Sequence, residues 1–218
     1  MFARKAQRKT VLERYRRLRT IRNEHADRAL QRLSRSHILK FGRRLGAIRN
    51  RHVLVAESEE ELQLLLDLAL YSRRSGASAI ERYSRSVRSP AGSEERAVLD
   101  AMCDAKFVLL VVECKHTVAG LVVRNAAGEE KPWLMDEMME ATAEPGHGLA
   151  MRLIQPDEFC MTTGTPIPMD RRLLQDVLLA LPPAERTDAS LDAMTDTVVE
   201  TIYKTAIRTG ILEAVVYA

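Results

Sequence analysis

Aromatic residues, cysteines and long apolar runs are scarce in this 218-residue chain, and each scarcity excludes a class of protein. Aromatic side chains make up 5% of the residues, so a core has to be built mainly from Leu, Val, Ile, Met and Ala. Three cysteines at unrelated spacings argue against a disulfide scaffold and favour a cytoplasmic location. No apolar run approaches the roughly 18 residues of a membrane-spanning helix, so we expect no membrane partner.

The chain also lacks the motifs that mark common active sites. It contains no G-x-x-x-x-G-K-S/T or G-x-G-x-x-G phosphate loop and no G-x-S-x-G nucleophile elbow. Asp136, Glu137 and Glu140 lie near His147 in the sequence, but without the ligand spacing of a known metal motif. An enzyme that uses this 136–147 region is therefore the least favoured function class. We expect no catalytic residue, no metal and no cofactor.

Positive charge is concentrated at one end of the chain. Residues 1–52 hold 17 Lys or Arg and three acidic residues, a balance of +14, whereas the remainder carries −11. Such a split favours either a basic arm for an anionic partner or an arm that lies on its own acidic body. The net charge of +3 does not reveal this uneven distribution.

Arginine dominates in this basic arm, and its planar guanidinium suits bidentate phosphate contacts. The leading hypothesis is therefore a non-enzymatic binding protein whose N-terminal helices contact the phosphates of RNA or DNA. The predicted contact residues are Arg14, Arg16, Arg17, Arg19, Arg43 and Arg44. The alternative is a protein-interaction or assembly module, in which the arm binds an acidic protein or another copy of the same chain.

The arm is expected to be helical. Val11, Tyr15 and Leu18 begin a thin apolar stripe at helical spacing, which Arg22 and His25 then interrupt, so this helix needs a partner. Hydroxyl residues at 34–36 can cap a second helix. We treat residues 1–52 as a basic helical arm and residues 53–218 as an α+β domain that folds without it.

In that domain, a helical layer comes before a sheet. Ser58 and Ser93 are placed to cap helices, and a further short helix is expected at 79–86. Short apolar runs separated by turn residues then predict a five-stranded antiparallel meander or small barrel at about 106–164. The expected strands are 107–113, 119–124, 131–135, 149–154 and 158–163. Helices at 170–181 and 190–208 close the α+β fold.

The middle third also resembles a small β-barrel domain of uncharacterised bacterial proteins. The resemblance is carried by a strand pair with the turn Gly128-Glu129-Glu130, the acidic pair Asp136-Glu137, the turn Pro145-Gly146-His147-Gly148 and the strand Ala150-Met151-Arg152. It implies a barrel-like sheet and no particular activity.

Overall fold

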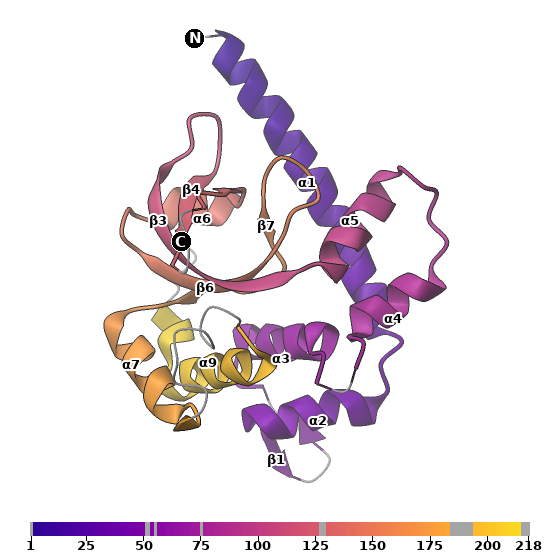
Figure 1. The fold of residues 1–218 in the computed structure, drawn as a ribbon, viewed down its shortest axis with the longest axis vertical. Coiled ribbons are helices and arrows are strands. Elements are labelled where there is room, and N and C mark those ends of the chain that lie inside the picture. Colours follow the sequence, from indigo (N-terminus) through magenta and orange to yellow (C-terminus); the bar gives the residue numbers. More distant parts are fainter. Residues whose placement is uncertain are drawn as a thin grey trace.

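The computed structural model describes residues 2–50, 53–54, 56–74, 76–126, 130–183 and 194–214. It is a mixed α+β fold with a nearly closed antiparallel sheet and helices at both ends (Figure 1). The helices are α1 (Phe2–Leu30), α2 (Arg35–Leu45), α3 (Glu59–Tyr71), α4 (Ala79–Ser86), α5 (Glu94–Cys103), α6 (Glu137–Thr142), α7 (Arg171–Ala180), α9 (Asp196–Thr209) and the 3-10 turn η2 (Ile211–Ala214). None of the helices described is both long and apolar enough to cross a membrane.

The main sheet has the strand order β5-β4-β3-β6-β7, and β8 also pairs with β6. A small separate hairpin joins β1 (Ile48–Asn50) and β2 (Val53–Leu54). The strands of the main sheet are β3 (Lys106–Lys115), β4 (Leu121–Asn125), β5 (Trp133–Leu134), β6 (Gly148–Ile154), β7 (Met161–Thr162) and β8 (Ile167–Pro168). Every pairing between these named strands is antiparallel, as predicted. The order is not that of a simple meander, because β6 pairs with β3 instead of β5.

Two backbone hydrogen bonds bring the ends of this sheet together. Cys160 N–H donates to the Trp133 carbonyl at 2.7 Å, and Met135 N–H donates to the Cys160 carbonyl at 2.8 Å. Side chains of β3, β4, β5 and β6 fill the interior, among them Val112, Val123 and Leu134. The predicted small barrel is therefore confirmed in its nearly closed form.

Side-chain oxygens start the helices where the sequence indicates. Ser58, Ser93 and Asp170 accept hydrogen bonds from the backbone N–H groups three residues later, and so cap α3, α5 and α7. Ser78 and Glu81 form a reciprocal capping box at the start of α4. At the far end, Gly210 adopts φ 67° in the left-handed region and ends α9.

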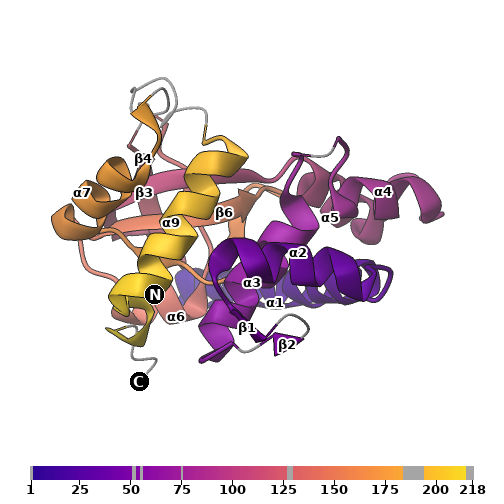
Figure 2. The same ribbon diagram turned by 90° about the horizontal axis from the view of Figure 1, so that it is seen from below.

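Helix α1 is part of the core of the molecule. Its Tyr15 and Leu18 are 2% and 1% exposed and pack in one cluster with residues of α3, α4 and α5, such as Leu99 and Met102. A second cluster joins α2, α3, α7 and α9 to one face of β3 and β6 through Phe107. In Figure 1, α3 and α9 lie beneath β6, and Figure 2, seen from below, shows α9 crossing in front of β3 and β6.

Some elements differ from the sequence prediction. The short helix α6 and strand β8 were not expected, and β5 and β7 are two residues long each instead of five or six. The last long helix begins at Asp196, while residues 190–193 of its predicted range lie outside the described part. Trp133, which the strand alternation places inward, is partly buried and donates from Nε1 to the Ala119 carbonyl at 2.6 Å.

Candidate functional site

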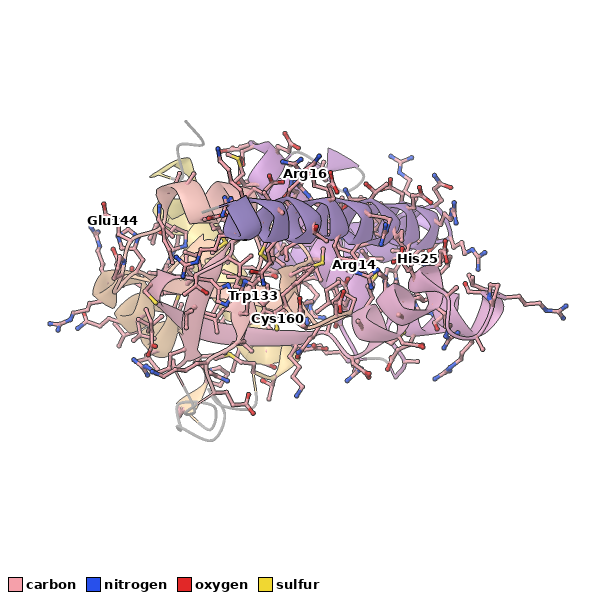
Figure 3. All side chains as sticks on the ribbon, turned by 90° about the horizontal axis from the view of Figure 1, so that it is seen from above. Arg14, Arg16, His25, Trp133, Glu144 and Cys160 are labelled. Carbon is pink, nitrogen blue, oxygen red and sulfur yellow. The ribbon has the colours of Figure 1, made fainter. Side chains whose placement is uncertain are left out.

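Four of the six predicted phosphate-contact residues form ion pairs among the described residues, and three of these four lie on α1. Arg14 reaches Glu94 and, at 2.6 Å, Asp157. Arg16 makes a two-point contact with Glu137 at 2.6 and 3.0 Å, and Arg17 lies 2.7 Å from Glu94. Figure 3 shows Arg14 and Arg16 leaving α1 on different sides. The basic helix thus lies on its own acidic body, which is one of the two arrangements that its charge favoured.

The other three predicted residues have different surroundings. Arg44, at the end of α2, is 2.6 Å from Glu200 of α9, in a largely buried pair with side chains 20% and 11% exposed. Arg19 and Arg43 are exposed. The six residues therefore do not converge on one surface site, since α1 and α2 hold them against different parts of the body.

The acidic residues weighed as metal ligands are engaged with α1. Glu140 accepts two hydrogen bonds from Arg8, at 2.7 and 3.0 Å, and Glu137 pairs with Arg16. Burial alone would raise the pKa of Glu140, but hydrogen bonds from Arg8 and from the backbone of Gly120 outweigh it and hold the pKa below its usual value. Among the described residues, no cluster of three or more His, Cys, Asp or Glu side chains could hold a metal ion.

A polar cleft of about 570 Å³ lies between α1 and the body. It is formed by the middle of α1, by α3, by the start of α6 and by the loop from β7 to β8, and its volume is typical of small-molecule sites. Its charged lining residues are Arg19, Arg22, Asp27, Glu59, Glu60, Asp67 and Asp136. The cleft thus collects both signs of charge in one place.

Arg22 is the most unusual of these residues. Its Nη1 donates to the Thr162 carbonyl at 3.0 Å, whereas its Nε is buried with no hydrogen-bond partner among the described residues. Among the described residues, Arg22 forms no ion pair with a carboxylate. Burial lowers the pKa of Arg22, partly offset by the nearby Tyr71, Tyr15 and Asp136. The guanidinium is therefore a partly desolvated cation without a counterion in contact.

Asp67 at the floor of the cleft is, in contrast, fully engaged. It accepts three hydrogen bonds from Arg152 at 3.0–3.1 Å, one from Tyr203 at 2.7 Å and one from Thr163 at 3.3 Å. Asp67 and Arg152 are 6% and 9% exposed. This network joins α3, β6 and α9. The charge of Asp67 is balanced by Arg152, and Asp67 forms no ion pair with Arg22 among the described residues.

Two further lining groups have capacity for a ligand. Asp136 caps α6 through Oδ1, which accepts from the N–H groups of Met138 and Met139 at 3.0 Å. Its Oδ2 has no hydrogen bond among the described residues. Burial raises the pKa of Tyr15 to about 12, so its hydroxyl stays protonated at neutral pH and can donate to an anion.

The surroundings of Cys160 disfavour nucleophilic chemistry at its thiol. Cys160 is buried beside the sheet closure, and burial raises the pKa of its thiol to about 11. A thiol that stays protonated at neutral pH is a weak nucleophile. This environment is that of a packing residue.

The apolar stripe of α1 carries a sequence signal for the cleft. Arg22 and His25 interrupt the apolar stripe of α1, and both turn inward: His25 is 3% exposed and bonded to Tyr83 and to the Glu95 carbonyl. A charged residue on the buried face of a helix has to find a buried partner or a ligand. The partner of His25 is the chain itself, while Arg22 has none with opposite charge.

The fold and cleft define a class of α+β protein in which a basic helix is fastened to a nearly closed sheet over a charged cavity. Residues 9–206 match the model of a Family of unknown function (DUF7986), and the chain belongs to this family. Comparison with curated proteins and with solved structures gives no match.

Proposed function

We propose that this protein binds a small anionic molecule in the cleft, with Arg22 as the residue that holds it. The observation that carries the proposal is the partly desolvated guanidinium, whose Nε is buried without a partner. Burying a charge is costly unless the charge is paired and hydrogen-bonded. A ligand carboxylate or other oxyanion in the cleft would supply the missing counter-charge.

The rest of the cleft supports such a ligand. A guanidinium carries five N–H groups, and one of those on Arg22 is used by the Thr162 carbonyl. The protonated Tyr15 hydroxyl adds a neutral donor, and Arg19 adds a second cation at the exposed rim. Charge-assisted hydrogen bonds of this kind are stronger than neutral ones.

Thermal unfolding with phosphate, sulfate, acetate and citrate tests the proposal. An anion that binds the folded state raises the melting temperature, by the equivalent of about 2.7 kcal/mol at a concentration of 100 Kd. We expect this increase in the parent protein and its loss in Arg22→Met. Without ligand, Arg22→Met should be as stable as the parent or more stable, because it removes an uncompensated charge.

The matched control is Arg28→Gln, since Arg28 lies on the same helix, is exposed and pairs with Glu24 away from the cleft. It should respond to anions like the parent. An unchanged anion response in Arg22→Met, or no response of the parent to any of the four anions, would contradict the proposal.

Nucleic-acid binding by α1 is the second candidate function. It is favoured by the exposure of Arg16 and Arg17, whose side chains are 61% and 57% accessible despite their ion pairs. Phosphates would have to displace Glu137 and Glu94 from these two residues. Neutralising the competitors in Glu94→Gln/Glu137→Gln should therefore tighten binding to mixed-sequence RNA or duplex DNA.

Fluorescence anisotropy at low and moderate salt measures this effect. If roughly four phosphates are contacted, log K should fall with log salt with a slope of about −4 on duplex DNA. Arg14, Arg16, Arg17 and Arg19 changed together to Gln should weaken all sequences alike, because phosphate contacts carry no sequence information. If the Glu94→Gln/Glu137→Gln variant binds neither RNA nor DNA at micromolar concentration, nucleic-acid binding by α1 is ruled out.

A further inference from the structure

We infer that the ligand of the cleft is a zwitterion of the amino-acid or short-peptide class, with its carboxylate on Arg22 and its ammonium group on Asp136. The inference rests on the proposed anion site and adds the chemistry of the rest of the ligand. It starts from the balance of charge around Arg22.

Carboxylates outnumber guanidiniums in the lining of the cleft. Arg19 and Arg22 face Asp27, Glu59, Glu60 and Asp136, while Asp67 is already neutralised by Arg152. A multiply charged phosphate would gain one buried cation and meet several repelling carboxylates. A ligand that carries both signs of charge fits this lining better than an anion alone.

Asp136 is the carboxylate best placed for the positive end of the ligand. Its charge acts on Arg22 and favours the guanidinium form, so the two groups lie in one electrostatic environment, although they form no ion pair. Oδ1 is committed to the cap of α6, and Oδ2 is left to accept from a ligand N–H. Arg22, with its unpaired Nε, and Asp136, with its unpaired Oδ2, therefore line the same cavity.

The mouth of the cleft also carries negative charge. Glu59 and Glu60 stand in the first turn of α3, where Glu60 has no hydrogen bond among the described residues. These two carboxylates would add to the attraction for an ammonium group at the cleft mouth. Met138, 40% exposed, and Leu66 provide apolar surface for a small side chain.

Titration calorimetry with matched peptides tests the inference. The probes are alanylalanine, its N-acetyl form, which lacks the ammonium group, and its amide, which lacks the carboxylate; alanine and propionate form a shorter pair. We expect the parent protein to bind the zwitterion at least about tenfold more tightly than the N-acetyl form, the value of one charge-assisted hydrogen bond.

Asp136→Asn is the decisive variant, because asparagine also caps helices and so keeps the start of α6. In this variant the advantage of the zwitterion over the N-acetyl form should disappear, while binding of the N-acetyl form should be unchanged or tighter. Asp100→Asn, at an exposed pair with Arg96 on α5, is the matched control and should retain the advantage.

The two proposals fail in different ways. If the N-acetyl form binds as tightly as the zwitterion to the parent, or if Asp136→Asn keeps the preference, the zwitterion inference is wrong and the anion site stands. If phosphate binds through Arg22 and no peptide or amino acid does, the inference is again wrong. If no probe binds and Arg22→Met changes nothing, the anion site is wrong as well.

Discussion

Arg152 and Asp67 form a buried ion pair that joins α3 to β6. Both are less than 10% exposed, and Tyr203 and Thr163 satisfy the remaining acceptor positions of the carboxylate. Opposite charge from Asp67 outweighs burial and raises the pKa of Arg152. Burial also raises the pKa of Tyr203, so its hydroxyl remains a donor.

Removing one member of this pair should be strongly destabilising. Arg152→Leu leaves the Asp67 carboxylate buried without its counter-charge, and we expect the free energy of unfolding to fall by about 3–5 kcal/mol in urea denaturation. Arg152→Leu/Asp67→Leu should recover much of the loss, because neither charge remains. Tyr203→Phe, which removes one hydrogen bond, serves as the smaller reference change. A loss below about 1 kcal/mol in Arg152→Leu would show that the pair is solvated.

Single residues were the hardest level to predict from the sequence. The caps Ser58, Ser93 and Asp170 were predictable, because capping depends on residues three positions apart. The partner of Arg152 is 85 residues away in the chain, and no local pattern identifies it. Arg22 could be singled out as a charged residue on an apolar face, but the lack of a partner is a property of the folded chain.

Helices α1 and α6 are held together by ion pairs. Arg8 and Arg16 hold Glu140 and Glu137, and Arg8 also donates to the Val118 carbonyl at 3.0 Å. The hydrogen bond from Arg16 holds the pKa of Glu137 below its ordinary value, against a smaller opposing effect of burial. The pKa of Glu140 is lowered too.

Lowered carboxylate pKa values make this fastening sensitive to acid. A carboxylate whose pKa is lower in the folded state stabilises the fold above its unfolded pKa, near 4.3, and this stability is lost as the pH falls through the folded pKa. Arg8→Gln should therefore lower the urea midpoint at pH 7 but have little effect at pH 3. The effect at pH 7 should be at most about 1 kcal/mol, because Arg8 is 43% exposed and solvent screens the pair.

Lys9→Gln is the control for this measurement, since Lys9 lies next to Arg8 and contacts the exposed Glu13 at 3.8 Å. Its urea midpoint should stay close to that of the parent at both pH values. An equal loss in Arg8→Gln at pH 7 and pH 3 would show that Arg8 acts through packing and not through Glu140.

Elements were predictable where their own sequence determines them. Apolar spacing and caps identify α3, α4, α5 and α7, and short apolar runs bounded by turn residues identify β3, β4 and β6. The two-residue strand β8 exists because β6 offers it partners at Leu149 and Ala150. Such a strand has too few residues for a periodic signal, and the same is true of the six-residue helix α6.

At the scale of the whole molecule, α1 contributes one side of the hydrophobic core. Val11, Tyr15, Leu18 and Ala29 pack against residues of α3, α4 and α5 that are themselves almost fully buried. The α+β class and the nearly closed sheet follow from the order of helical and strand signals along the chain. The boundary at residue 52 was predicted from the distribution of charge. The apolar core, however, includes residues on both sides of that boundary.

A chain of residues 53–218 is therefore expected to aggregate or to lose its cooperative melt, contrary to the expectation from the sequence. Burial of Tyr15 and of Leu18 each contributes about 1.5–3 kcal/mol, out of a typical total of 5–15 kcal/mol. A chain that begins at Arg8 loses residues 4–7, which are exposed, along with residues 1–3, and should melt close to the parent. A soluble, cooperatively melting 53–218 chain would show that the arm is dispensable for folding.

The wide sequence separation of the α1 ion pairs sets a timetable during protein synthesis. Asp157 is made 143 residues after Arg14. At a translation rate of about 5–20 residues per second, Arg14 is made roughly 7–30 seconds before this carboxylate is available. For that interval the nascent chain presents a segment with ten basic and three acidic residues between Phe2 and Leu30, so the finished protein conceals a charge that its own biosynthesis exposes.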